Sequence, residues 1–266
     1  MSRVRSTAIL IVLLHSLWSP SAQAQTINEI LDAVSKNVMR FEDLISDFVC
    51  SETVTSTQYE SGRIVKQKTV SSTFTGVQRS NEENKVRFAF TESREVLTID
   101  GKRVRPGTAF PKLPYRFAGG YSSLLITTFA PDNLEVHNYS LGDRYRSGNS
   151  GAVLVKFTTK EGQQKLRSIL QGTQVLSKDA GAAWVDLDTF QVIRLQRQSL
   201  NLPSDLSRSM ATIDYGPVTI GENTFWMPVR IRAEVTERDS AFSVSYLAEY
   251  TDCKKFTADI KILPNP

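Results

Sequence analysis

The residue types that most often carry catalysis are scarce in this chain. It contains two histidines, His15 and His137, and two cysteines, Cys50 and Cys253. A serine or cysteine nucleophile needs a neighbouring base, and only His137 remains once the leader described below is removed. Strand alternation puts His137 beside Glu135 and Tyr139 on one face, which predicts a solvated strand face rather than a catalytic site.

Two aspartates have a spacing that could bind a cation. Asp186 and Asp188 form a D-x-D segment, as in calcium loops, but aspartate is also favoured in hairpin turns, and we expect the turn. The sequence lacks a nucleophile elbow, a P-loop and a dinucleotide-binding glycine motif. We therefore predict a protein that is not an enzyme and binds no metal or cofactor. Glycoside hydrolysis by two acids that the fold brings together stays open.

The N-terminus predicts an exported protein. Two arginines precede an apolar run over 8–14, and an A-x-A segment ends at Ala24. The run is shorter than the roughly 20 residues that span a bilayer. We predict a signal peptide over 1–24, one soluble domain over 25–266 without a stable membrane span, and a periplasmic or extracellular location. An uncleaved N-terminal anchor is the alternative.

This compartment changes what the two cysteines imply. Disulfides persist outside the cytosol, so Cys50 and Cys253 are predicted to pair. Two separate buried thiols are the alternative. Neither cysteine belongs to a C-x-x-C motif, so we expect no redox catalysis.

Composition excludes two further classes of protein. Apolar residues make up 40% of the chain and charged residues 23%, which is typical of a folded protein and not of a disordered one. The formal net charge is only +4, and two arginines lie in the predicted leader, so we expect no nucleic-acid partner.

The elements that position these side chains begin with a helix. Thr26 and Glu29 have the spacing of a capping box. Apolar residues then recur every three or four positions as far as Phe48, which predicts one helix over 26–48 with a single apolar stripe.

Most of the remaining chain alternates between apolar and polar residues. The alternation is clear over 86–91, 229–235, 242–250 and 256–262, and each segment predicts a strand with one buried face. Short turn signals, such as the one at 61–62, separate the strands and predict antiparallel hairpins. About ten strands are expected, which is too many for a flat sheet.

Two segments interrupt the strands. Residues 105–121 combine prolines and glycines with aromatic residues, and a short helix is predicted after them, over 122–129. Residues 161–170 are predicted to form another short helix. The aromatic segment either packs on the rim of the sheet or hinges at Gly119 and Gly120 over an apolar site, and both interpretations stay open.

Together these features resemble the periplasmic lipoprotein-carrier and lipoprotein-sorting superfamily. The stretches 183–195 and 218–228 look like two hairpins of that group, and 48–50 and 252–256 resemble segments of secreted bacterial proteins of similar length. The resemblance implies an α+β fold. A strongly curved antiparallel sheet, a half-open barrel, would carry the N-terminal helix and one or two short helices over its concave face. It also implies that the concave face holds acyl chains.

The apolar strand faces and the aromatic segment supply the candidate ligand-binding residues. These are Phe88, Phe90, Phe110, Tyr115, Phe117, Tyr121, Val229, Ile231, Phe242 and Val244. We expect the strand residues to converge on one concavity and the aromatic segment to lie at its mouth, because the predicted helices cover the sheet incompletely. The predicted function is to hold a lipid or acyl-like ligand. The alternative is a non-enzymatic module of the envelope with a filled core, which binds another envelope protein.

Overall fold

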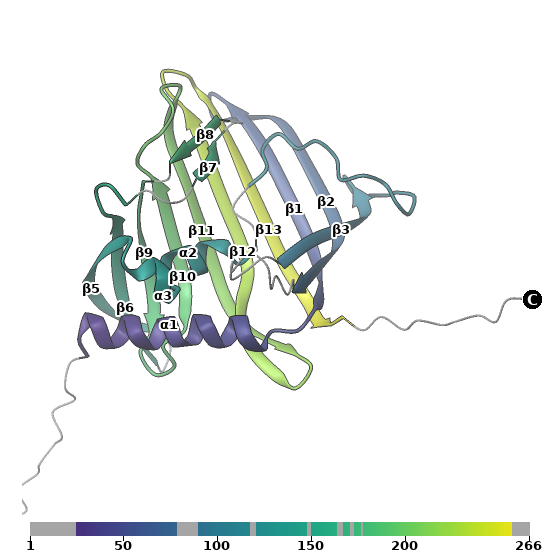
Figure 1. The fold of residues 1–266 in the computed structure, drawn as a ribbon. Helices are drawn as coiled ribbons and strands as arrows, with labels where there is room; N and C mark the ends of the chain where they lie inside the picture. Colours follow the sequence, from purple (N-terminus) through teal and green to yellow (C-terminus); the bar gives the residue numbers. More distant parts are fainter. Residues whose placement is uncertain are drawn as a thin grey trace, which may run out of the picture.

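The computed structural model describes residues 25–78, 90–117, 121–147, 150–163, 167–170, 173–176 and 178–256. Its main feature is one large, curved antiparallel sheet with helices packed against its inner face (Figure 1). The inner face is the one that carries the buried, alternating side chains of the strands. The predicted α+β half-barrel is confirmed.

The helices are α1 (Ile27–Leu44), α2 (Ser123–Phe129) and α3 (Pro131–Leu134). The strands are β1 (Phe48–Glu60), β2 (Arg63–Gln78), β3 (Phe90–Ile99), β4 (Lys102–Arg103), β5 (His137–Ser147), β6 (Ser150–Thr159), β7 (Arg167–Leu170), β8 (Thr173–Leu176), β9 (Asp179–Asp186), β10 (Val192–Ser199), β11 (Leu206–Ile220), β12 (Asn223–Glu237) and β13 (Phe242–Lys255).

Eleven strands form the main sheet in the order β4-β3-β2-β1-β13-β12-β11-β10-β9-β6-β5, and β7 and β8 form a separate hairpin. Most neighbours in the sheet are also neighbours in sequence, as hairpins require. The pairing of β1 with β13 is different, because it joins the first of the described strands to the last of them. Among the described residues, β4 and β5 are the two edges of the sheet.

Helix α1 begins at the predicted capping box. The Thr26 hydroxyl accepts from the Glu29 N–H at 3.3 Å, and the Glu29 carboxylate accepts from the Thr26 N–H at 2.7 Å. The predicted C-terminal end at Phe48 is wrong, because the helix ends at Leu44 and Ile45 is already extended. Ile45 and Phe48 are both buried, so they continue the apolar spacing without continuing the helix.

The predicted helix over 161–170 is also wrong. Residues 161–163 belong to a turn, and Arg167–Leu170 are strand β7, which pairs with β8. A short apolar run does not separate helix from strand by its spacing alone, which explains the error. Strand β13 ends at Lys255, so Phe256 lies beyond it. The rest of the strand predicted over 256–262, and the predicted signal peptide, lie outside the described residues.

The turns follow the sequence signals. At the β1–β2 turn, Ser61 and Gly62 have φ angles of 50° and 76°, the left-handed conformation that tight hairpins need. At the β9–β10 turn, the Asp186 carboxylate accepts hydrogen bonds from the N–H groups of Asp188 and Thr189, at 3.2 and 2.8 Å. The D-x-D segment therefore has the geometry of a turn.

A disulfide joins Cys50 to Cys253, which are 203 positions apart in the sequence, and the predicted pairing is confirmed. It lies at a register shift between β1 and β13, between Val49 and Ser51. The bond thus links the start of the first strand to the end of the last. Among the described helices, none is long and apolar enough to cross a membrane.

Candidate functional site

The inner face of the sheet has two different covers. Helices α1 and α2 lie over one part, where Phe41 packs edge-on against Phe225 and Phe129 against Phe157, with ring centroids 6.0 and 6.5 Å apart. Over β1 and β13 the cover is the segment 104–117, which forms neither helix nor strand. We call residues 104–117 the cover segment.

Tyr121 lies just beyond the cover segment and is only 1% exposed. Its ring centroid lies 5.6 Å from that of Phe48, 5.1 Å from Phe74 and 4.8 Å from Tyr250. Its hydroxyl donates to the Pro228 carbonyl at 2.9 Å. Burial raises the pKa of this phenol well above its usual value. Tyr121 is therefore a side chain of the core and not part of a mobile lid.

Ser56 of β1 anchors the cover segment. Its side chain points inward, and its hydroxyl donates to the Tyr115 carbonyl at 2.8 Å and accepts from the Tyr115 N–H at 2.9 Å. One buried hydroxyl thus satisfies both backbone groups of Tyr115. The predicted hinge at Gly119 and Gly120 lies outside the described residues.

The aromatic side chains of the cover segment are only half-buried. Phe110, Tyr115 and Phe117 all pack against the main core but keep part of their surface in water. The Phe117 ring lies 6.2 Å from that of Tyr246, and the Arg116 guanidinium lies 5.6 Å from the centroid of the Phe110 ring. Burial raises the pKa of Tyr115 to about 12.

Tyr115 also reaches a second, smaller apolar cluster at the end of the sheet far from α1. This cluster consists of buried Leu206, Val235 and Val244, with half-buried Tyr115, Leu202 and Phe242 packed against it. The structure therefore brings three of the predicted residues, Tyr115, Phe242 and Val244, into one place.

The remaining candidate residues are dispersed. Ile231 is 2% exposed and belongs to the main core. Val229 is half-buried at a register shift between β11 and β12, beside the position that a Cβ on Gly216 would take. Phe90 opens β3, but nothing is described of its side chain, and Phe88 lies outside the described residues.

A buried charge network lies beside Tyr121, and sequence reasoning missed it. Arg94 of β3 donates to both carboxylate oxygens of Glu52, at 2.8 and 3.0 Å, and the Ser72 hydroxyl donates to the same carboxylate at 2.8 Å. Burial lowers the pKa of Arg94, but the hydrogen bonds and charge of Glu52 more than compensate and raise it. Glu92 accepts from the Tyr121 N–H at 2.6 Å, so an acidic side chain also holds the backbone at Tyr121.

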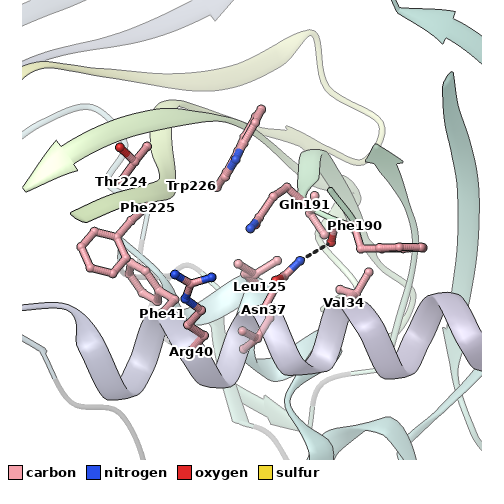
Figure 2. Close-up of a pocket in the computed structure, with 12 residues that line it drawn as sticks. Val34, Asn37, Arg40, Phe41, Leu125, Phe190, Gln191, Thr224, Phe225 and Trp226 are labelled. Atoms are coloured by element: carbon pink, nitrogen blue, oxygen red, sulfur yellow. Dashed lines mark hydrogen bonds between the residues drawn. The ribbon is translucent and has the colours of Figure 1, made fainter. Parts of the chain in front are cut away.

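A small hollow lies between α1 and the turns at the lower end of the sheet (Figure 2). Its volume is about 50 Å³, room for one or two water molecules and far below the size of a ligand pocket. Asn37 closes one side by donating to the carbonyls of Thr189 and Phe190, both at 2.9 Å.

Two larger hollows lie elsewhere. One, of about 520 Å³, runs along α1 beside α3. The other, of about 420 Å³, lies over β1, β12 and β13 and includes Val244. Strand alternation places most of its lining side chains, such as Arg232, Glu234 and Leu247, on the outer face of the sheet.

Comparisons with known proteins give structural matches only. No family model matches the sequence, and no curated protein matches it significantly. The chain is similar to a DUF1329 family protein from Desulfovibrio piger, with 14% identity over 86% of this chain and 92% of the other and a TM-score of 0.43. It is also similar to a LolA superfamily protein from Nitrosomonas europaea, with 12% identity over 89% and 96% and a TM-score of 0.37.

A third similar structure is described as an outer membrane lipoprotein-sorting domain, from Vibrio parahaemolyticus. Its identity is 9% over 87% of this chain and 94% of the other, with a TM-score of 0.42. Two of the three descriptions, the LolA superfamily and the lipoprotein-sorting domain, name the superfamily that the sequence resembles. All three TM-scores are below 0.5, so these matches assign no function to this chain.

His137 does not lie where the sequence predicts. It is 6% exposed instead of solvated, and its ring packs edge-on against Phe157 at 5.4 Å. Burial lowers its pKa, and its Nδ1 atom has no hydrogen-bond partner among the described residues. The prediction failed because α3 and β6 enclose the start of β5. Among the described residues, no three acidic, histidine or cysteine side chains gather as metal ligands would.

Proposed function

We propose that the protein is a non-enzymatic, periplasmic binding protein that holds an acyl-like ligand between the inner face of the sheet and the cover segment. The contrast between the two covers carries this proposal. The stripe of α1 is buried, with Ile30, Val34 and Val38 at 0–2% exposure. The aromatic side chains of the cover segment are only half-buried over an apolar sheet face.

An acyl chain would take the place of these half-buried aromatic side chains above Val244 and Tyr246. The cover segment must then move, and the two hydrogen bonds between Ser56 and Tyr115 must break. Each such bond stabilises by about 1 kcal/mol, so the opening costs about 2 kcal/mol from this contact. Burial of each methylene gains about 0.8 kcal/mol, so eight methylenes would gain about 6 kcal/mol. The gain exceeds this cost.

The location rests on two features. The predicted signal peptide would export the chain. The disulfide between Cys50 and Cys253 agrees with an oxidising compartment, because such bonds are rare in the cytosol.

Native mass spectrometry of the exported protein tests the proposal directly. We expect a mass increment that corresponds to a copurified lipid, and a saturable signal when a fluorescent fatty acid is titrated. A wild-type protein that carries no lipid and binds no acyl probe would remove the carrier function.

A second candidate function is a structural or interaction module of the envelope with a filled core. The aromatic cluster around Tyr121 favours it, because this part of the inner face is filled with side chains. The small volume of the hollow beneath α1 favours it as well. The two candidates differ in one result: a filled module releases no lipid on denaturation, whereas a carrier does.

A further inference from the structure

The tip of the β1–β2 hairpin has an unusual surface. We call residues 60–67 the hairpin tip, and all eight are exposed. It lies at the end of the sheet opposite α1 (Figure 1). Two adjacent residues of the hairpin tip have branched apolar side chains: Ile64 is 57% exposed and Val65 is 49% exposed. Single exposed apolar residues are common, but two adjacent ones on a projecting tip call for an explanation.

A bulge explains how both side chains reach water. Gln58 is paired with Lys66 and Tyr59 with Ile64, so Val65 is an extra residue with no partner across the hairpin. Strand β3 starts to pair with β2 only at Val70. The residues of β2 before Val70 therefore project beyond their neighbour by about 20 Å, at about 3.3 Å per residue.

The projecting part is basic. Arg63, Lys66 and Lys68 lie there, against the single acid Glu60, so residues 60–68 carry a net charge of +2. Lysines on an unpaired strand edge also prevent unwanted sheet pairing. That role explains the charges, but it does not explain two exposed branched apolar side chains between them.

The same end of the sheet carries another exposed apolar residue, Leu200, at 46% exposure. Backbone hydrogen bonds hold both places: Ser61 N–H donates to the Ala241 carbonyl of the β12–β13 turn at 2.9 Å, and Leu200 N–H donates to the Lys178 carbonyl before β9 at 2.7 Å. Strands β2 and β10 are five positions apart in the sheet, so the two apolar points are about 24 Å apart measured across the strands.

We propose that this end of the sheet docks on a lipid bilayer that contains anionic phospholipid, with Ile64 and Val65 inserted among the headgroups. A stable protein interface needs about 800 Å² per partner, and a convex tip with two apolar side chains does not offer it. A bilayer surface is flat and can contact the hairpin tip and Leu200 at the same time, and its anionic headgroups complement the charge of the basic tip. The inference is independent of the acyl-binding function, because the tip lies outside the cover segment and its anchor.

Vesicle co-sedimentation of the purified exported protein tests this inference, with vesicles of phosphatidylcholine alone or mixed with phosphatidylglycerol. We expect the protein to bind the mixed vesicles, and we expect this binding to weaken in about 0.5 M salt, because salt screens the attraction between the basic tip and the anionic headgroups. The double variant Ile64→Ser/Val65→Ser should bind at least tenfold more weakly. Each basic side chain near an anionic surface contributes about fivefold, so Lys66→Gln should lose about that factor.

Leu44→Ser is the matched control, since Leu44 is 49% exposed at the opposite end of the molecule. It should bind vesicles like the wild type. Circular dichroism checks that all variants fold, and a fatty-acid titration should be the same for every one of them. The inference is overturned if the wild type does not sediment with mixed vesicles, or if Leu44→Ser lowers binding as much as the tip variant. Self-association of the wild type without vesicle binding would also overturn it.

Discussion

The variant Ser56→Ala tests whether the cover segment opens to admit a ligand or is a permanent part of the core. Ser56 is fully buried and its hydroxyl makes both hydrogen bonds to Tyr115, at 2.8 and 2.9 Å. Their loss destabilises the closed cover segment by about 2 kcal/mol, at about 1 kcal/mol each. At about 1.4 kcal/mol per factor of ten, the open population rises about thirtyfold. The apparent affinity of a ligand that binds the open form rises by up to the same factor.

The assay pairs a fluorescent fatty-acid titration with a thermal melt. We expect Ser56→Ala to bind the probe about tenfold to thirtyfold more tightly while its melting temperature falls by several degrees, at about 2–4 °C per kcal/mol for a domain of this size. Most core mutations weaken both properties, so the opposite signs are diagnostic.

Thr55→Ala is the control for this experiment. Thr55 precedes Ser56 on the same strand, but its hydroxyl faces the other side of the sheet and lies 3.3 Å from that of Thr69. The control should leave probe affinity unchanged. If a folded Ser56→Ala protein binds the probe no more tightly than the wild type, the cover segment does not gate the ligand and our reasoning is wrong.

Three further predictions concern stability. Tyr121→Ser should lower the free energy of unfolding by about 3–5 kcal/mol, measured by urea denaturation, because it empties a buried aromatic cluster, whereas Phe117→Ser at a half-buried site should cost much less. Replacing Cys50 and Cys253 by serine should cost at most about 5 kcal/mol for a loop of 203 residues, and reductant should then shift the melting curve of the wild type but not of the variant. Burial lowers the pKa of His137, so the unfolded chain binds more protons, and stability should fall as the pH drops below about 6.5; His137→Phe should flatten this dependence in urea titrations at pH 5 and 7.5.

Local signals in the sequence were sufficient for much of the fold. The capping box at Thr26 starts α1, the Ser61-Gly62 signal produces a hairpin turn, and the period-two segments become antiparallel strands. These features depend on neighbours in the chain. The disulfide needed one more argument, the compartment, because nothing local connects residues 203 positions apart.

Features that depend on tertiary contacts were harder to predict. The helix end at Leu44 was missed because Ile45 and Phe48 stay buried after the chain leaves the helix. His137 was placed in water because its cover comes from elements that its own alternation does not reveal. Glu52 left a usable signal, since it occupies an inward position between Cys50 and Val54 on β1, and an inward acid requires a partner such as Arg94.

For the site, the sequence identified the aromatic residues but not their roles. The segment around Phe110 and Phe117 is half-buried, whereas Tyr121 is a core residue. The difference comes from the contacts of Tyr121 with Phe74 and with Pro228, which lie far away in the sequence. The spacing of residues along the chain does not predict contacts between residues that lie so far apart in the sequence.

The pairing of β1 with β13 divides the molecule into two meanders, one from β1 to β4 and one from β5 to β13. Hairpins within each meander close short loops and form early, whereas the seam between the meanders closes a loop of about 200 residues and has the largest entropic cost. Helix α1 belongs by sequence to the first meander, yet its Phe41 packs on Phe225 of the second. Among the described strands, β13 is synthesised last, and it completes the middle of the sheet instead of its edge. Strand β1 therefore lacks one of its two partners until β13 has been made.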